Sequence, residues 1–192
     1  MSSKITKKVV ILYGTCYGST EEVAVKIGEL LKESGIDANV YNLEDIINDK
    51  KFNLDSYDGI ILGTAIYNCS NWTKGAKQFL KGFSKRLKQG NQPLAIFTLC
   101  GTASDPTKIP ELKKSLIEDK LKKHSLKTQC YDVFGGVLDL SEESRMSKFD
   151  IKIGKLMSNT LPNIKKGQNN DFRDWNKIRA FAESFLEILL SS

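Results

Sequence analysis

Apolar, β-branched stretches alternate along this chain with stretches whose apolar residues recur at helical spacing. The expected strands are KKVVILY (7–13), DANVYNL (37–43), DGIILGTAI (58–66), PLAIFTLC (93–100) and TQCYDVFGGVLDL (128–140), the last interrupted by Gly135-Gly136. Helices are expected at 20–34, 73–88, 109–123 and 142–157, and a final helix is expected to carry Trp175 through Ile188. This alternation without internal repeats predicts an α/β fold, a doubly wound five-stranded parallel sheet with helices on both faces.

Length and composition indicate one globular domain with an appendage. The 192 residues are 40% hydrophobic and 27% charged, as is ordinary for a folded domain. No apolar run approaches the roughly 20 residues that span a bilayer, and the N-terminus shows no secretory signal. We therefore expect a cytoplasmic protein whose core covers about 7–140, with a C-terminal extension over about 141–190.

Charge and cysteine content bound the possible functions. The 29 basic and 23 acidic residues give a net charge of +6, which indicates an anionic partner or surface without identifying it. Four dispersed cysteines, Cys16, Cys69, Cys100 and Cys130, form no CxxC pair, which argues against a metal site. Cys16, Cys69 and Cys100 fall in three loops that follow expected strands. They act there either as redox thiols or as small hydrophobic residues. The only histidine, His124, lies outside these loops, so no catalytic residue is predicted.

The stretch LYGTCYGST (12–20) joins the first strand to the first helix. A helix leaves its first amide groups unpaired, and their partial positive charge favours an anion such as phosphate. The hydroxyls of Thr15, Ser19 and Thr20 add neutral donors, and Gly18 lets the backbone come close. The spelling matches neither GxGxxG nor a Walker loop. The alternative is purely structural, a capping box formed by Ser19 with Glu22.

Two further loops are expected at the same edge of the sheet, after the third and fourth strands. They span 64–72, rich in small and aromatic residues, and 99–105. The carboxyl ends of parallel strands form the usual ligand site of such sheets. The three loops together suit a flat heteroaromatic ring with a phosphorylated tail.

These loops resemble the flavodoxins over roughly 7–140, because Thr15-x-x-Gly18-Ser19-Thr20 looks like their phosphate signature. The resemblance implies a sheet of order 2-1-3-4-5 and an FMN cofactor. It places the phosphate on Thr15, Cys16, Tyr17, Gly18, Ser19 and Thr20. It places the isoalloxazine ring between Thr64, Ala65, Ile66, Tyr67 and Asn68 on one side and Cys100, Gly101, Thr102 and Ala103 on the other. Tyr67 and Trp72 are the candidates for stacking on the ring, and the alternative for Trp72 is an anchor packed on Ala76.

The tail resembles a narrower group. GGVLDLSEESRMSKFDIKIGKLM and DFRDWNKIRAFAESFLEIL are similar to flavodoxin-type, menaquinone-dependent protoporphyrinogen dehydrogenases. This resemblance implies an enzyme that passes electrons to a quinone. The other hypotheses are an electron carrier that meets a redox partner protein, and a flavin-free binding module on the same fold.

Basic residues gather in two segments. One is a stripe of lysines at 74, 77, 81, 85 and 88, and the other is the span from Arg145 to Lys166, where Met146, Phe149, Ile153 and Met157 line one helix face. The second segment suits peripheral contact with an anionic membrane surface. It suits equally a helix that docks its apolar face on the sheet. Nucleic acid is not an expected partner.

Overall fold

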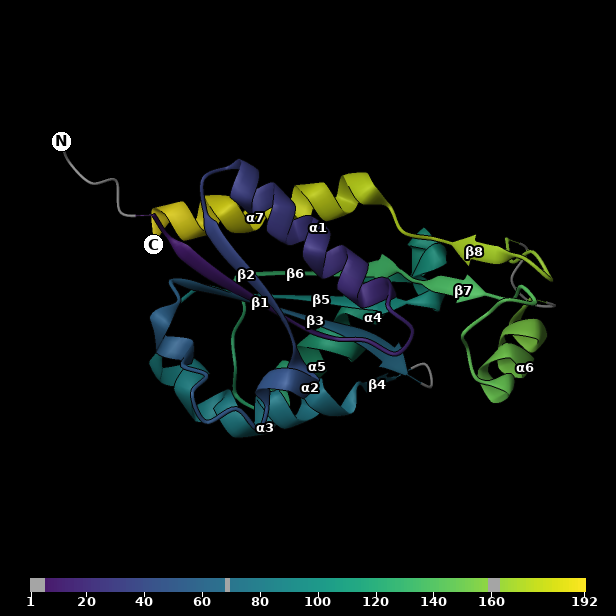
Figure 1. Cartoon of the computed structure of the whole chain (residues 1–192), viewed down its shortest axis with the longest axis horizontal. Coiled ribbons are helices and arrows are strands. Elements are labelled where there is room, and N and C mark those ends of the chain that lie inside the picture. Colours follow the sequence, from purple (N-terminus) through teal and green to yellow (C-terminus); the bar gives the residue numbers. More distant parts are fainter. Residues whose placement is uncertain (1–5, 68–69, 159–162) are drawn as a thin grey trace.

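The central feature of the computed structural model is a parallel sheet in the order β2-β1-β3-β5-β6 (Figure 1). The structure describes residues 6–67, 70–158 and 163–192. The strands of this sheet are β1 (Lys8–Gly14), β2 (Asp37–Asn42), β3 (Gly59–Tyr67), β5 (Leu94–Cys100) and β6 (Cys130–Gly135), and the short β4 (Asn71–Trp72) pairs with β3 as a hairpin. With β4 set apart, this is the expected 2-1-3-4-5 order. The less apolar β2 lies at an edge, because an edge strand buries less of its surface.

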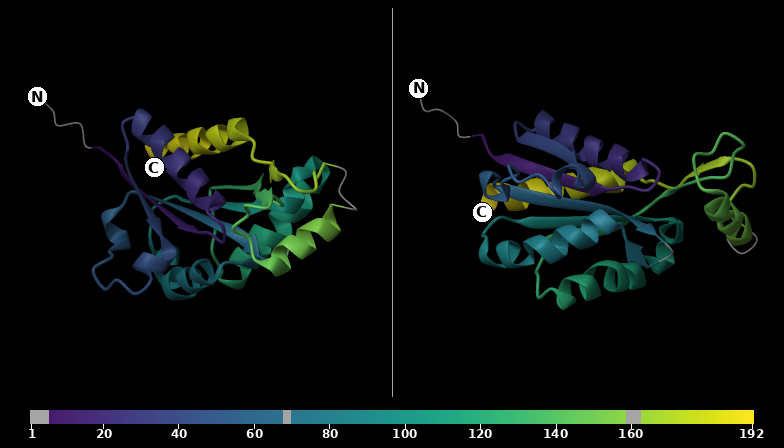
Figure 2. Two further views of the ribbon diagram at one scale, coloured as in Figure 1. Left: turned by 45° about the vertical axis from the view of Figure 1, so that its right-hand side comes forward. Right: turned by 60° about the horizontal axis from the view of Figure 1, so that its bottom comes forward.

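Helices cover both faces of the sheet (Figures 1 and 2). On one face lie α1 (Ser19–Glu33) and α7 (Trp175–Ser191); on the other lie α2 (Leu43–Ile46), α3 (Lys74–Gln89), α4 (Ile109–Lys113) and α5 (Asp119–Lys123). A π-helical segment, Lys114–Glu118, joins α4 to α5, so the expected helix at 109–123 is continuous in space. Short 3₁₀ turns span Leu54–Ser56, Gly101–Ser104 and Pro106–Lys108. Within the described ranges, no helix has both the length and the apolar character needed to cross a membrane.

Aromatic side chains hold the two layers to the sheet. Phe97 of β5 meets Phe181 of α7 edge to face, with ring centroids 5.9 Å apart. Phe79 and Phe83 of α3 stack at 4.7 Å on the opposite side. Every residue of β5 is buried, which explains its unbroken apolar sequence. Burying one such side chain contributes roughly 1.5–3 kcal/mol to folding.

The expected fifth strand, 128–140, is in fact two strands in different sheets. β6 ends at Gly135, and β7 (Val137–Asp139) pairs antiparallel with β8 (Asn169–Asp171), which lies between the last two expected helices. The chain leaves the main sheet at the glycine pair, where the amide of Phe172 donates to Gly136 O at 3.0 Å. A Cβ at Gly135 would collide with the carbonyl oxygen of Phe172, so glycine is what permits this close approach of the two segments.

β7, β8 and the helix between them, α6 (Lys148–Met157), form an appendage to the main sheet. α6 is shorter than the expected helix at 142–157. Ser147 begins it as the N-cap, accepting a hydrogen bond from the backbone N–H of Asp150. Upstream, the Ser141 hydroxyl and amide both bond to Asp139, which holds that segment in a turn. Figure 2 shows β7, β8 and α6 extending beyond the end of the main sheet.

Candidate functional site

A pocket of about 1040 Å³ opens at the carboxyl ends of β1, β3 and β5, between the sheet and the appendage. Its sheet side is lined by Cys16, Tyr17, Ser19, Glu22, Ala65, Ile66 and Leu99, and its opposite side by Gly136, Val137, Leu138, Asp139, Ser141, Glu143, Arg145, Met146, Asp150, Ile153, Gly154, Asn169 and Arg173. This is where an open parallel sheet is expected to bind its ligand.

The predicted phosphate loop enters α1 through a left-handed residue. Gly18 has φ 95° at the N-cap position, and no side chain caps the helix. Its amide instead donates to Thr15 Oγ1 at 2.9 Å. The capping box of Ser19 with Glu22 does not form, because the Glu22 carboxylate pairs with Arg173. The first amides of α1 are thus left for a ligand.

Thr20 supplies the clearest indication that an anion belongs here. Its Oγ1 is one of two buried side-chain oxygens that lack a hydrogen-bond partner among the described residues, the other being Thr98 Oγ1 inside the sheet. Buried hydroxyls are normally hydrogen-bonded, so this one is a donor in need of an acceptor at the N-terminus of α1. Because Thr20 is 0% exposed and outside the pocket lining, it can donate to a phosphate only if the loop shifts when the ligand binds. The residues of this loop therefore fit the phosphate of FMN.

The second predicted loop is largely a β-hairpin. β3 continues through Tyr67, and Ile66 pairs with Trp72 of β4. Ala65 and Ile66 line the pocket, whereas Thr64 is buried and its hydroxyl contacts Thr73 Oγ1 at 3.1 Å.

Several predictions concern residues beyond this description. Asn68 and Cys69 lie outside the described residues, as does the side chain of Tyr67, so the stacking of Tyr67 on the ring stays a prediction. Trp72 is only 2% exposed and donates its Nε1–H to Leu116 O at 2.7 Å. It packs in the same core cluster as Ala76, as the anchor alternative expects.

The third predicted loop starts at the end of β5. Leu99 lines the pocket, while Cys100 and Ala103 are buried beneath it. The segment with Gly101 and Thr102 forms a 3₁₀ turn, and Gly136 passes directly over Gly101. Of the predicted site residues, the pocket brings together Cys16, Tyr17, Ser19, Ala65 and Ile66. The others that the structure describes in full lie outside its lining: Thr15, Gly18, Thr20, Thr64, Cys100, Gly101, Thr102 and Ala103.

The residues from Gly136 to Gly154, with Asn169 and Arg173, supply a wall of the pocket that the sequence analysis did not assign to the site. The Gly135-Gly136 interruption and the resemblance of the tail to quinone-linked dehydrogenases were the signals that fell in this region. Arg173, for which the sequence carried no signal, is 8% exposed and pairs with Glu22 at 2.6 Å and Asp171 at 2.7 Å. Its guanidinium also lies 4.8 Å from the Trp175 ring centroid. Burial raises the pKa of Asp171, but the hydrogen bonds from Arg173 outweigh it and hold this pKa below its ordinary value.

Tyr17 joins the phosphate loop to the appendage. Its hydroxyl donates to Asp150 Oδ2 and accepts from the backbone N–H of Ser147 at 3.3 Å. Desolvation and the bond to Asp150 raise the pKa of Tyr17, so it remains a neutral donor at physiological pH. The loop and α6 are therefore in direct contact although 133 residues separate Tyr17 from Asp150.

Comparison with known proteins agrees with the fold. Residues 10–163 match the flavodoxin domain family. The chain is 25% identical over 181 residues to protoporphyrinogen IX dehydrogenase [quinone] of Escherichia coli K12, an alignment that covers 94% of this chain and 96% of that protein.

Solved structures show the same fold. Rubredoxin:oxygen oxidoreductase of Desulfovibrio gigas superposes with a TM-score of 0.60 at 13% identity, covering 97% of this chain and 37% of that one. Oxidised flavodoxin 2 of Bacillus cereus gives 0.54 at 18% identity, covering 94% and 99%.

The fold and the loop define a flavin-binding α/β protein of the electron-transfer class. The chain belongs to the flavodoxin domain family. The predictions of fold, of FMN as the cofactor and of a function in electron transfer are thereby confirmed.

Proposed function

We propose that this protein is an FMN-dependent oxidoreductase that takes electrons from an organic substrate and delivers them to a quinone. The size and shape of the pocket carry the proposal. Ligand pockets usually measure about 300–1000 Å³, and this one, of about 1040 Å³, continues from the flavin loops to a second wall. It therefore has room for a flavin and for a second molecule beside it. The name of the E. coli relative, a quinone-linked dehydrogenase of nearly the same length, supports this reading.

The roles of the chain's residues follow from their positions. The amides at the start of α1 and the hydroxyls of Thr15 and Thr20 would hold the phosphate, and Ala65 and Ile66 would bound the ring. Bound FMN supplies the electron-transfer chemistry. Val137, Leu138 and Ile153 give the opposite wall an apolar part that excludes water from the substrate space.

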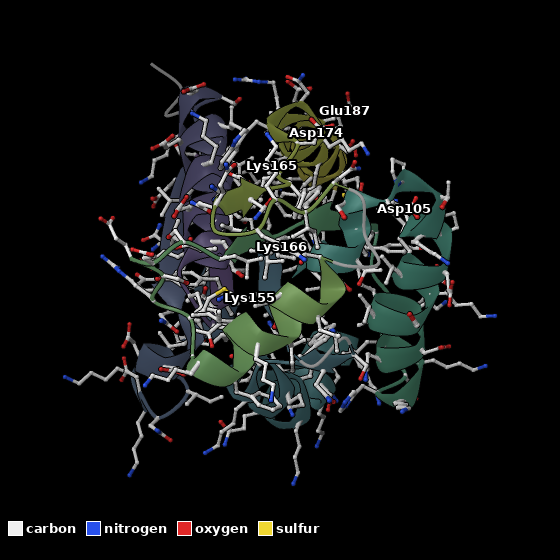
Figure 3. All side chains as sticks on the ribbon, turned by 90° about the vertical axis from the view of Figure 1, so that its right-hand side faces the viewer. Asp105, Lys155, Lys165, Lys166, Asp174 and Glu187 are labelled. Atoms are coloured by element: carbon white, nitrogen blue, oxygen red, sulfur yellow. The ribbon has the colours of Figure 1, made fainter. Side chains whose placement is uncertain are left out.

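The outer face of α6 supports peripheral contact with an anionic membrane, where lipid quinones reside. Phe149 and Leu156 are 62% and 68% exposed, and the exposed lysines at 148, 152 and 155 lie on the same helix. Figure 3 shows Lys155 on the same end of the molecule as Lys165 and Lys166. Exposed apolar side chains among lysines are typical of helices that rest on lipid headgroups.

The first test is spectroscopic. Addition of FMN should give a bound-flavin absorption spectrum, and stepwise reduction with dithionite should pass to the fully reduced flavin without a stable one-electron state. Protoporphyrinogen with a menaquinone analogue would then be the substrate assay. A stable one-electron state with no turnover would instead indicate an electron carrier. The basic residues of α3, which contains no acidic residue, favour an acidic protein partner in that case.

The membrane contact has a separate test. Changing Lys148, Lys152 and Lys155 together to glutamate should abolish co-flotation with anionic vesicles. The matched control changes the exposed lysines 77, 81 and 85 of α3, which alters the charge equally on a different surface. Equal loss in both variants would show a general charge effect, and a wild type that never floats would refute the contact.

A further inference from the structure

Two carboxylates of the pocket, Glu22 and Asp150, border the phosphate loop. They differ in whether a positive charge lies beside them. Glu22 faces the Arg173 guanidinium at 2.6 Å. Asp150 bonds to the hydroxyls of Tyr17 and Ser147 and makes no ion pair within the part of the chain that the structure describes. Hydroxyl donors stabilise a carboxylate without cancelling its charge. Asp150 therefore brings to the edge of the loop a negative charge that no ion pair among the described residues neutralises, although Arg145 and Arg173 line the same pocket.

Hydrogen bonds from two hydroxyls hold the Asp150 carboxylate in place. Ser147 Oγ donates to Asp150 Oδ2 at 2.7 Å, and Tyr17 Oη donates to the same oxygen while accepting from Ser147 N–H. Because Ser147 is the N-cap of α6, the tyrosine acts as a second cap on that helix. α6 also packs through Gly154, whose backbone lies against the side chains of Leu138 and Leu140.

The negative charge is felt inside the loop. Cys16 neighbours Tyr17 in the loop, and the pKa of its thiol is raised first by burial and then by the charges of Asp150 and Glu44. Burial concerns the thiol alone, but the charges of Asp150 and Glu44 act on any anion in the loop. A phosphate bound there is repelled by the same two carboxylates.

We propose that Asp150 is a residue that sets the affinity of the loop for phosphate, and that occupation of the loop by phosphate and docking of α6 on Tyr17 oppose each other. The proposal rests on the proposed function, in which this loop holds the phosphate of FMN, and deepens it. By linkage, a ligand that is weakened by the docked helix must weaken the docking to the same degree. FMN therefore loosens α6, the helix whose outer face carries the proposed membrane contact.

The affinity test uses Asp150→Asn, which keeps the shape and removes the charge. Its dissociation constant for FMN should be about fivefold lower than that of the wild type at low salt, and this difference should shrink at high salt. Riboflavin, which lacks the phosphate, should show no such difference. Tyr17→Phe, which frees α6 from the loop, should also bind FMN more tightly.

A matched control is available in Tyr131→Phe. Tyr131 Oη donates to Glu118 Oε1 at 2.7 Å, the same kind of tyrosine–carboxylate bond at a position outside the pocket lining. This variant should bind FMN as the wild type does.

Amide hydrogen exchange measures directly how firmly α6 is held. FMN should speed amide exchange across 148–157 in the wild type, riboflavin should not, and in Asp150→Asn FMN should have no such effect. Slower exchange on FMN binding, or an Asp150→Asn variant that binds FMN no more tightly, would overturn this inference alone. Absence of FMN binding in the wild type would overturn it together with the proposed function.

Discussion

Replacement of Thr20 by valine should stabilise the protein without FMN and weaken its binding of FMN. Thr20 is 0% exposed, and its Oγ1 has no partner among the described residues. A buried hydroxyl without a hydrogen bond costs roughly 1–3 kcal/mol. Valine has the same branched shape and a similar helix propensity. The free energy of unfolding should therefore rise by about 1 kcal/mol, which corresponds to roughly 2–4 °C in Tm for a chain of this size.

The effect of the same substitution on FMN binding is unfavourable. The hydroxyl that is unpaired in the free protein would donate to the phosphate, and a hydrogen bond to a charged group contributes roughly 1.5–3 kcal/mol. Its loss should raise the dissociation constant for FMN about 10- to 150-fold. Urea unfolding followed by circular dichroism measures the first effect, and quenching of FMN fluorescence on titration measures the second.

Thr98→Val is the matched control for this experiment. Thr98 Oγ1 is equally buried and unpaired among the described residues, but it lies within β5 of the sheet, whereas Thr20 lies in the first turn of α1. Its replacement should stabilise the protein similarly and leave FMN affinity unchanged. A Thr20→Val variant that unfolds more easily, or that binds FMN as well as the wild type, would refute the assignment of Thr20 to the phosphate.

Three other substitutions test the surroundings of the pocket. Trp72→Phe removes the hydrogen bond to Leu116 O and should cost about 1–2 kcal/mol in urea unfolding, with unchanged FMN affinity; weakened FMN binding would return Trp72 to the flavin site. Arg173→Gln removes the ion pairs to Glu22 and Asp171, whose partly exposed carboxylates limit the expected loss to about 1–2 kcal/mol, and a loss that persists unchanged in 1 M salt would contradict an electrostatic origin. Asp171→Asn should be less stable than the wild type at neutral pH, and this difference should shrink as the pH falls. The folded pKa of Asp171 lies below its ordinary 3.8. The carboxylate therefore stabilises the protein fully above about pH 4 and progressively less as the pH drops through the folded value. A difference from the wild type that stayed constant down to pH 2 would argue against that linkage.

Local patterns were sufficient for most of the helices and strands. The helix ends illustrate this: the helix expected at 20–34 ends at Glu33, and Gly35, with φ 83°, lets the chain turn away from it. Asp174 opens α7 by accepting from the amides of Asn176 and Lys177. Such signals lie within a few residues of the feature that they specify, so a sequence shows them directly.

Predictions failed where a distant segment decides the outcome. The break after Gly135 depends on the backbone of Phe172, and the pairing of β7 with β8 depends on the same crossing. Arg173 reaches Glu22 across 151 residues. Neither contact leaves a periodic or motif-like trace in the sequence.

The sequence by itself determined the parallel sheet and the family and led to the prediction of the phosphate loop, because buried strands, helical periodicity and the Thr15 to Thr20 motif are all local. Only the tertiary structure decided that the Thr20 hydroxyl is buried and unpaired, and that Tyr17 turns from its loop to cap α6. Only the tertiary structure placed Asp150 as an uncompensated charge at the pocket, since a charge acts through space and its effect depends on the groups around it.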